Sequence, residues 1–556
     1  MSNTVVPLYG IHEVTIEGSN PSPRRPFHAE ILGFFTHESG DEIGPVPAYY
    51  DGDGIWKIRF SPNLLGIWKG RVDSPHGAIG PVHLGEIECV PNEAPNAHGR
   101  LRIDPAHRQR FVWEDGTPFV ALGFECDWLF ALHQAKPDAF DRALDILTKH
   151  GFNYVVTNVY AHSGFSEPGH EWVFAPPRLY PWEGTNEEPI HSRLNLAFFR
   201  DFDAVIAALH ERGIVAHLMI HVQNKHVNWP ERYSDDDDLY WRYVLARYQA
   251  YGNVVWDVGK ESYNYVRMYD DPDYVLDRIS FIRRFDGHEH LVTVHDAIAH
   301  SPGVAGLADD AADFVSDQIH LGDIDAYNRE AIRRFRTLDK PYMNIEYGYE
   351  VGAEPIKTYM SRTTRSWEDI LLWTWAIVLG GGYPTYYYNN TAWDLVKFEP
   401  EPPGWGRYRY MSAFLADVDL NRMLPDNEYV DRGYCLAEHG RQYLVFLPEG
   451  GDVALDLSAA REEDRVEVVW MDVFEGDRAS APIDGKGFST SLVNPLPHRA
   501  NPCVLYVTVE PQPESRAKDL EDEELASIIL DEWEDADAVD EEPAEAEKVV
   551  AATATG

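Results

Sequence analysis

The stretch NVVWDVGKESYNY, residues 253–265, begins with an apolar run that ends abruptly at Lys260 and Glu261. Its valines and tryptophan are typical of a buried β-strand, because a strand covered on both faces reads as a nearly continuous apolar run. Such a strand would deliver a lysine and a glutamate side by side at its carboxyl end. Seven other runs of this kind accompany it in the sequence, so the fold depends on how these runs are connected.

The eight strand-like runs alternate with longer helix-like segments. Three of these segments end at a glycine, as in FDRALDILTKHG, and glycine readily takes the left-handed conformation of a helix C-cap. Alternating strands and helices predict parallel strands, and eight such units predict a (β/α)8 TIM barrel. A doubly wound open sheet is the alternative, although no GxGxxG motif follows the first strand. The predicted strands are 118–126, 153–160, 214–222, 253–261, 290–297, 313–320, 341–348 and 383–389.

The regions on either side of the barrel have all-β patterns. Residues 1–95 alternate short strand-like runs with turn residues and predict a small β-sandwich, whose aromatic residues are interpreted as packing. Residues 96–117 are expected to form a polar connector, residues 118–423 the barrel and residues 424–512 a second β-sandwich. Residues 513–556 contain 16 Asp and Glu against 3 Lys and Arg, which predicts a disordered acidic tail.

The charge composition indicates which kinds of molecule the protein is not expected to bind. A net charge of −44 argues against nucleic acids and anionic membranes. The basic residues comprise 12 Lys and 36 Arg, and an acid-rich, lysine-poor chain suits a salt-rich cytoplasm, because salt screens self-repulsion. A halophilic host is therefore a hypothesis, with an acidic mesophilic protein as its alternative. A homo-oligomer is left open.

The sequence also predicts a cytoplasmic protein that does not span a membrane. No apolar run approaches the length of a membrane span, and the first residues lack the charged and apolar regions of a secretory signal. The four cysteines lie far apart without CxxC spacing, which favours buried thiols over disulfides or zinc ligands.

Two glutamates at predicted strand ends form a candidate active site, because function in TIM barrels lies at the carboxyl ends of the strands. Glu261 ends the fourth strand, and Glu346 lies in the seventh, within NIEYG. Glycoside hydrolysis needs such a pair, one carboxylic acid to protonate the leaving oxygen and one carboxylate as nucleophile or base. If the enzyme retains configuration, the two carboxyl groups should lie about 5–5.5 Å apart.

Other polar and aromatic residues near the strand ends are candidates for sugar binding. His217 and His221 are separated by four strand residues, about 13 Å, which is too far for two ligands of one ion. No metal site is predicted, and the proposed chemistry requires no cofactor. The candidate substrate-binding residues are Lys260, Asp127, Trp128, His162, His221, His320, Trp393 and Asp394.

Several motifs resemble one known family. YYDGDGIWKIRFSP, residues 49–62, is similar to the FYDGDGxWxxRFxP motif in the front β-sandwich of apiosidase-like (DUF4038-type) glycoside hydrolases. The phrase HGRLRID…FVWEDGTPFVALG resembles the opening of their barrels, and TAWDL, residues 391–395, resembles the signature after their eighth strand. The resemblance covers about residues 5–510. It implies a barrel of the retaining clan in which Glu261 matches the acid/base and Glu346 the nucleophile.

The chain departs from this pattern at Lys260, where the clan usually has an asparagine that binds the sugar 2-hydroxyl. The lysine could donate to a sugar hydroxyl, attract a carboxylated sugar, lower the pKa of Glu261, or instead pair with Asp257. The expected protein is an exo-acting retaining glycoside hydrolase with an oligosaccharide or glycoside substrate. The alternatives are a catalytically inactive carbohydrate-binding or assembly protein and, less favoured, a metal-dependent barrel hydrolase that uses the histidines.

Overall fold

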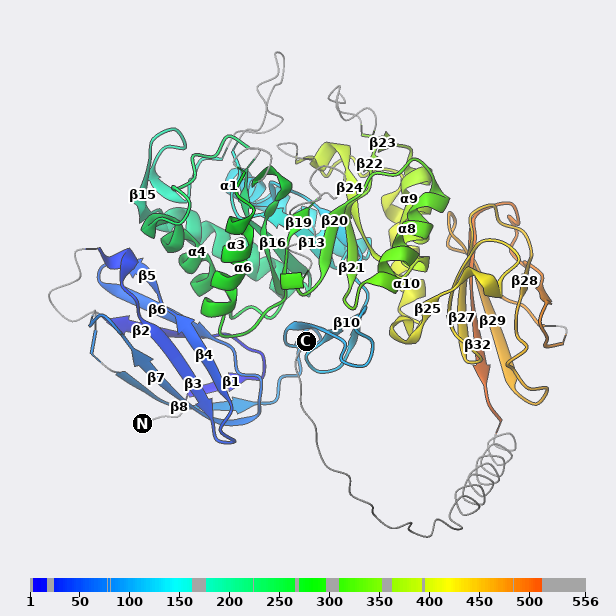
Figure 1. Cartoon of the computed structure of the whole chain (residues 1–556), viewed down its shortest axis with the longest axis horizontal. Helices are drawn as coiled ribbons and strands as arrows, with labels where there is room; N and C mark the ends of the chain where they lie inside the picture. The colour runs from blue at the N-terminus through cyan, green and yellow to red at the C-terminus, as the bar shows by residue number, and fades with distance from the viewer. Residues whose placement is uncertain are drawn as a thin grey trace, which may run out of the picture.

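At the centre of the molecule lies a nearly closed barrel of parallel strands surrounded by helices, with sheet-rich regions on two sides (Figure 1). The predicted TIM barrel with flanking β regions is thereby confirmed. The predicted tail, residues 513–556, and the two candidate residues Trp393 and Asp394 lie outside the described residues. The computed structural model describes residues 4–17, 25–77, 79–80, 82–162, 177–223, 225–265, 270–296, 310–352, 363–392, 396–483 and 485–512.

The barrel strands follow one another around the ring in chain order. The ring closes where the first strand pairs in parallel with the last, with Gly123 opposite Thr385. The fifth strand is split at Val294 into two short pieces, one paired with the fourth strand and the other with the sixth. The strands are β12 (Gly123–Glu125), β13 (Tyr154–Asn158), β16 (Val215–Val222), β17 (Val254–Lys260), β18 (Val292–Thr293), β19 (His295–Asp296), β20 (Val315–Gln318), β21 (Tyr342–Glu346) and β24 (Tyr383–Tyr388).

The helices cover the outside of the barrel, and polar side chains mark several of their starts. Asn195, Ser234, Asp323 and Ser366 each accept a hydrogen bond from a backbone N–H in the first turn of the helix that follows. Among the described residues, no helix is long and apolar enough to cross a membrane. The helices are α1 (Leu129–Ala135), α2 (Pro137–Lys149), α3 (Leu196–Glu211), α4 (Asp235–Tyr248), α6 (Asp273–Phe285), α8 (Ile324–Thr337), α9 (Trp367–Leu379) and α10 (Trp405–Leu415).

A small antiparallel sheet packs against the amino-terminal end of the barrel. Phe111 is fully buried and packs against Phe314 and Tyr383, at ring-centroid distances of 5.2 and 4.8 Å, where β20 and β24 begin. The segment that was expected to be a connector, residues 96–117, thus supplies two of the three strands of this sheet. They are β9 (Leu101–Ile103), β10 (Phe111–Trp113) and β11 (Pro118–Phe119).

The N-terminal region consists of two sheets around one core. Phe35, Trp56, Ile58, Phe60 and Trp68 are buried in this core. The five-stranded sheet has the order β1 (Thr4–Pro7), β8 (Val82–Val90), β7 (Gly66–Asp73), β3 (Leu32–His37) and β4 (Glu42–Pro47). The three-stranded sheet has the order β2 (His12–Glu17), β6 (Ile55–Phe60) and β5 (Tyr49–Gly52).

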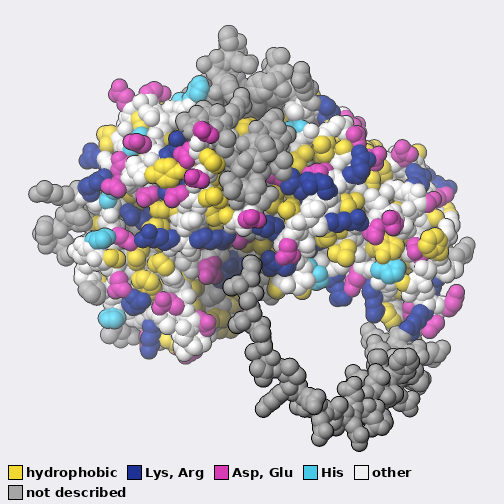
Figure 2. Space-filling model, viewed as in Figure 1, with side chains coloured by type: hydrophobic (Ala, Val, Ile, Leu, Met, Phe, Trp, Pro, Cys, Tyr) yellow, Lys and Arg dark blue, Asp and Glu magenta, His cyan; other side chains and the backbone are white. Residues whose placement is uncertain are grey.

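The C-terminal region is also sheet-rich and packs on the barrel through α9, where Trp375 stacks with Phe446 at 5.8 Å. A short two-stranded sheet consists of β28 (Val453–Leu455) and β31 (Thr490–Leu492). The larger sheet has the order β25 (Leu424–Pro425), β26 (Tyr434–Glu438), β27 (Gln442–Leu447), β32 (Cys503–Glu510), β29 (Arg465–Asp472) and β30 (Arg478–Ser480). On the face shown in Figure 2, acidic and basic side chains are interspersed over all three regions.

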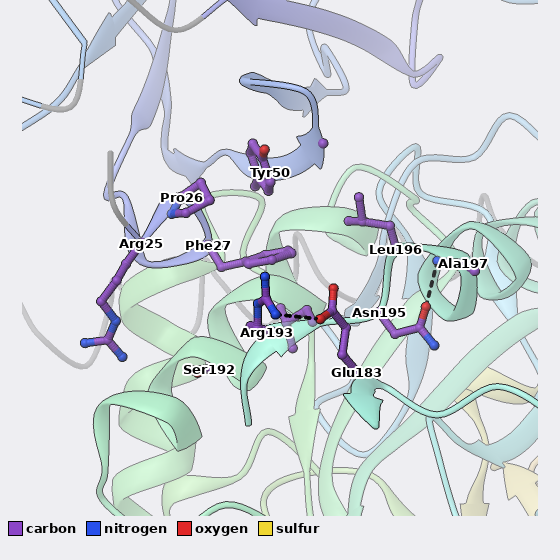
Figure 3. A pocket seen from close by; sticks show the side chains of 12 residues that line it. Arg25, Pro26, Phe27, Tyr50, Glu183, Ser192, Arg193, Asn195, Leu196 and Ala197 are labelled. Carbon is purple, nitrogen blue, oxygen red and sulfur yellow. Dashed lines mark hydrogen bonds and ion pairs between the residues drawn. The ribbon is translucent and has the colours of Figure 1, made fainter. Parts of the chain in front are cut away.

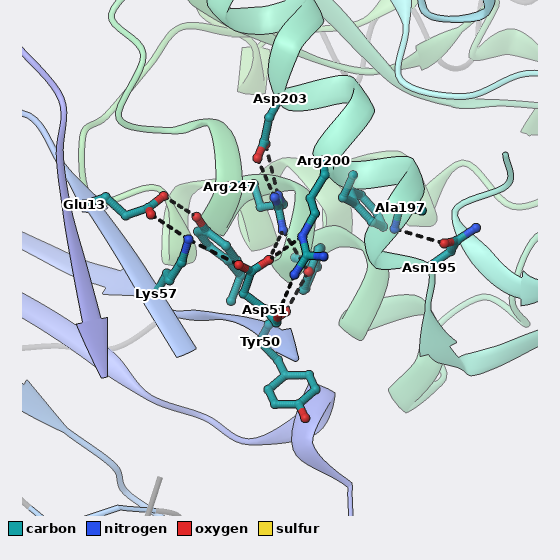
Figure 4. Close-up of polar contacts among 12 residues, drawn as sticks. Glu13, Tyr50, Asp51, Lys57, Asn195, Ala197, Arg200, Asp203 and Arg247 are labelled. Carbon is teal, nitrogen blue, oxygen red and sulfur yellow. Dashed lines mark hydrogen bonds and ion pairs between the residues drawn. The ribbon is translucent and has the colours of Figure 1, made fainter. Parts of the chain in front are cut away.

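Partly buried charges join the N-terminal sandwich to the barrel helices. Arg59 on β6 donates two hydrogen bonds to Asp203 on α3, at 3.1 and 2.9 Å. Arg247 on α4 donates to the same carboxylate, through Nε at 3.0 Å. Beside them, Asp51 accepts from Arg200 on α3 at 3.3 Å (Figure 4). Because one carboxylate satisfies two buried guanidinium groups, the position of the sandwich on α3 and α4 is tightly specified.

We expect Asp203→Ala to destabilise the full-length protein by about 1–3 kcal/mol, because two buried guanidinium groups lose hydrogen bonds to Asp203 while Glu13 and Asp51 still pair with them. Asp145→Ala is the matched control, since that aspartate pairs with Arg212 at 3.0 Å but its side chain is 68% exposed. An exposed pair contributes about 0–1 kcal/mol. Urea unfolding followed by circular dichroism measures both variants, and equal losses would contradict the role given to Asp203.

Candidate active site

Glu346 is the last residue of β21, and its carboxylate has donors around both oxygens. Its Oε1 accepts hydrogen bonds from Gln318 Nε2 at 2.7 Å and from the Tyr349 hydroxyl, and lies 3.5 Å from His320 Nε2. Its Oε2 lies 3.5 Å from the ammonium of Lys260. Only 1% of Glu346 is exposed. The carboxylate is therefore held in one orientation at the carboxyl end of its strand.

The surroundings of Glu346 favour its charged form. Burial would raise the pKa of Glu346, but the charge of Lys260, the hydrogen bond and charge of His320 and the charge of His295 together outweigh burial. The pKa of Glu346 therefore lies well below its ordinary value. The side chain is an ionised carboxylate at neutral pH.

Lys260, at the end of β17, points toward carboxyl groups of two other strand ends. Its ammonium donates to Glu125 Oε1 at the end of β12, and it lies 3.2 Å from Asp127 Oδ1 in addition to its contact with Glu346. Burial would lower the pKa of Lys260, but the surrounding carboxylates outweigh burial and raise the pKa well above its ordinary value. The lysine is thus a permanent cation, with 1% of the residue exposed.

This arrangement answers one of the sequence-based alternatives for Lys260, the pairing with Asp257. The ammonium contacts carboxyl groups at the ends of other strands, and the predicted sugar contact stays a prediction. The other expected partner, Asp257, has different neighbours, because its carboxylate pairs with His217 at 2.7 Å and accepts from the Gly259 N–H at 2.8 Å. Barrel closure, which brings β12 and β21 to the end of β17, decides the partners of Lys260.

The pKa of Glu125 is shifted in the opposite direction from that of Glu346. It is fully buried, and burial raises its pKa well above the ordinary value. Lys260 partly offsets this effect, while Asp127 and Glu346 add to it. One ammonium is therefore shared by three carboxyl groups, and the pKa of Glu125 is raised while that of Glu346 is lowered.

Glu261 follows β17 directly and turns away from the strand path. Its φ of 52° lies in the left-handed region, which is uncommon for a residue with a side chain. Its Oε2 accepts hydrogen bonds from the Tyr263 hydroxyl at 3.0 Å and from Asn264 Nδ2 at 3.3 Å. Burial raises the pKa of Tyr263, and the charges of Glu261 and Glu346 both raise it further. The two glutamates therefore act on one tyrosine at the barrel mouth.

The other predicted residues fall into two groups. His320 is partly exposed beside Glu346, Asp127 contacts Lys260, and His162 is partly exposed with its ring 6.2 Å from that of Tyr180.

His221 and Trp128, in contrast, are buried among aromatic side chains. His221 is 1% exposed and stacks on Trp229 at 4.1 Å, and Trp128 is fully buried with its ring 5.8 Å from that of Phe130. Both rings are covered by protein, and their assignment as sugar contacts stays a prediction.

Four residues of the site were not identified from the sequence. Gln318 and Tyr349 donate to Glu346, and Tyr263 and Asn264 donate to Glu261. Gln318 precedes His320 by two positions on the same predicted strand, so shared strand parity could have indicated it. Among the described residues, no group of three or more His, Cys, Asp or Glu side chains is arranged to hold a metal ion.

Known proteins share this architecture. Residues 106–412, more than half of the chain, match the family described as "Apiosidase-like, catalytic domain", and residues 5–75 match a domain of unknown function, DUF5060. The resemblance inferred from the motifs is thereby confirmed. None of the curated proteins matches the chain.

Solved structures give the same fold. A "putative glycoside hydrolase" from Bacteroides vulgatus ATCC 8482 is 20% identical with a TM-score of 0.72, and the match covers 91% of this chain and 100% of that protein. A glycoside hydrolase family 5 protein from the same organism is 18% identical with a TM-score of 0.56, covering 74% of this chain and 94% of that protein. At these identities the likeness shows the fold.

We expect Glu125→Gln to change the free energy of unfolding by less than about 1 kcal/mol, because burial favours the neutral acid at this position and glutamine is a neutral group of the same shape. Lys260→Met should cost about 3–5 kcal/mol, because it leaves buried carboxylates without their cation. Urea unfolding at pH 7 compares the two variants. A loss in Glu125→Gln as large as that in Lys260→Met would mean that Glu125 is ionised.

Proposed function

The chain belongs to the apiosidase-like family and is a glycoside hydrolase, and we propose that it cleaves glycosidic bonds in oligosaccharides with retention of configuration. The observation that carries this proposal is the environment of Glu346. A buried carboxylate that is kept ionised by a lysine and oriented by two hydrogen-bond donors has the properties of a nucleophile.

In the proposed reaction, Glu346 attacks the anomeric carbon while Glu261, in its acid form, protonates the glycosidic oxygen. The C–O bond to the leaving sugar breaks, and a glycosyl ester forms on Glu346. Glu261, now a carboxylate, then removes a proton from a water molecule, whose oxygen attacks the anomeric carbon. The ester bond to Glu346 breaks, the sugar is released, and both glutamates return to their starting forms. The donors on Oε1 keep the carboxylate in one orientation, which favours attack along a single path.

We propose that the role of Lys260 is to keep the nucleophile Glu346 ionised, and not to bind the sugar. Its ammonium is 3.5 Å from Glu346 and is enclosed by Glu125 and Asp127. A lysine at this position provides what the asparagine of related enzymes cannot, a full positive charge. The proposal therefore predicts that Lys260 governs the pH dependence of the reaction more than substrate affinity.

We further propose that the enzyme attacks chain ends. The small exposed fraction of Glu346 supports this mode, because a chain end reaches a covered carboxylate more readily than an interior sugar does. Product chromatography on neutral hexasaccharides tests it: a single sugar released at a time agrees with exo action, and a spread of intermediate lengths contradicts it.

Glu346→Ala should abolish turnover of aryl glycosides, with a loss of at least about 10⁴-fold, in a protein that circular dichroism shows to be folded. Azide should restore part of the activity by occupying the space of the missing carboxylate, and the glycosyl azide should have inverted configuration. NMR of the products gives the stereochemistry. Near-native rates in Glu346→Ala would reject the assigned nucleophile, and a panel of aryl glycosides untouched by the native protein would favour a carbohydrate-binding protein without activity.

Lys260→Met should move the acidic limb of the kcat/KM–pH profile upward by roughly 1–3 pH units. The sign follows from the charge: without the cation the pKa of Glu346 rises, so the active ionised form appears only at higher pH. Lys260→Arg keeps the charge and should keep the limb near its original position. Lys149→Met, an exposed lysine paired with Glu401, is the matched control. An unmoved limb with a raised KM would assign Lys260 to substrate binding.

A further inference from the structure

A cavity lies where the N-terminal sandwich meets the barrel, and neither Glu261 nor Glu346 lines it. Its volume is about 600 Å³. One side is formed by β5 and residues 25–27, and the other by the hairpin of β14 (Trp182–Gly184) and β15 (Pro189–Leu194) and by the start of α3 (Figure 3). The residues that matter for its chemistry are Phe27, Tyr50, Glu183, Ser192, Arg193 and Asn195.

The lining combines aromatic rings with polar groups. Phe27 and Tyr50 are both half-buried and pack edge to face with their ring centroids 5.0 Å apart. The hairpin and the start of α3 supply a hydroxyl, an amide, a carboxylate and a guanidinium group. A sugar matches this combination, because its C–H faces pack on rings while its hydroxyls both donate and accept hydrogen bonds.

The charges in the lining point to a neutral ligand. Arg193 pairs with Glu183 at 3.2 Å, and Arg25, which also lines the cavity, donates to Asp236 at 3.3 Å. Each of these charged side chains therefore has a partner of opposite charge. An anionic ligand would have to displace an existing partner, whereas a hydroxyl can bind to the outer edge of an intact pair.

Both sides of the cavity are held in place before any ligand binds. The Tyr50 ring packs against Trp56 at 5.1 Å, and the Tyr50 carbonyl accepts from the Tyr243 hydroxyl on α4 at 2.8 Å. Asn195 Oδ1 accepts from Ala197 N–H at 3.1 Å, which caps α3 and leaves the amide NH2 as the group that can donate to a ligand. Together with the charges around Asp51 and Asp203, these contacts make the cavity preformed, which lowers the entropic cost of binding (Figure 4).

We propose that this cavity is a second binding site, for a neutral oligosaccharide. The β14–β15 hairpin belongs to the connection between β13 and α3, which runs at the carboxyl end of the barrel strands. A chain bound here would therefore be kept on the side of the barrel where Glu346 lies. The choice of a sugar as ligand rests on the proposed function, whereas the cavity and its preformed walls do not.

The binding test uses the full-length protein carrying Glu346→Ala, titrated calorimetrically with xylohexaose, cellohexaose, mannohexaose and, as an acidic probe, trigalacturonate. Adding Tyr50→Ala should weaken binding of a neutral hexasaccharide at least tenfold. Because Tyr50 also packs internally, the double change Glu183→Ala/Arg193→Ala on two exposed side chains provides a second variant with the same expectation. The control is Phe488→Ala, which removes an exposed ring elsewhere, 79% exposed.

The proposal is overturned if no neutral hexasaccharide binds, if only trigalacturonate binds, or if both cavity variants bind as tightly as the Phe488→Ala control. Kinetics separate this site from the proposed reaction. With native Glu346, the cavity variants should hydrolyse a small aryl glycoside normally but show a raised KM for a hexasaccharide. A native protein that hydrolyses no glycoside, yet loses hexasaccharide binding in the cavity variants, would reject the proposed function and support the second site.

Discussion

The ammonium of Lys260 among three carboxyl groups is the interaction on which the mouth of this barrel depends. Glu125, Asp127 and Glu346 come from the ends of two strands, and a single cation on a third strand lies within reach of all of them. Three negative charges around one positive charge in a covered site would be costly, and burial accordingly raises the pKa of Glu125 while Lys260 helps to lower that of Glu346. In the proposed reaction, the negative charge with which Glu346 attacks the sugar would thus depend on how three carboxyl groups share one lysine.

A rigid frame is required for such a cluster, because its contacts join strands that are distant in the chain. Parallel pairing closes the ring, and the small sheet containing Phe111 packs on the opposite end. The N-terminal sandwich is fixed to the outside of the same frame through Asp203, which satisfies Arg59 and Arg247 together. Around Lys260 and around Asp203, the buried charges fix how strands and regions are placed relative to one another more than they add to the free energy of unfolding.

The same interface explains why a cavity can exist away from the mouth. Its rings come from the sandwich and most of its polar groups from the barrel, so neither region could form it alone. The aromatic residues of the N-terminal strands were interpreted as packing from the sequence, and Trp56 and Trp68 do pack in the core. Tyr50 both packs against Trp56 and lines the cavity, a double role that depends on where the barrel helices lie.

The sequence by itself determined the barrel, its flanking β regions and the family, because parallel strands covered on both faces leave apolar runs and the family leaves local motifs. The sequence also placed Glu261 and Glu346 at strand ends, because the predicted strands and their order along the chain are enough to show this. Tertiary structure alone decided that Lys260 contacts Glu125 and Asp127, that Gln318 and Tyr349 donate to Glu346, and that His221 is buried beside Trp229. These contacts join residues far apart in the chain or depend on how the chain turns after a strand ends. The local pattern of apolar and polar residues predicts neither long-range contacts nor such turns.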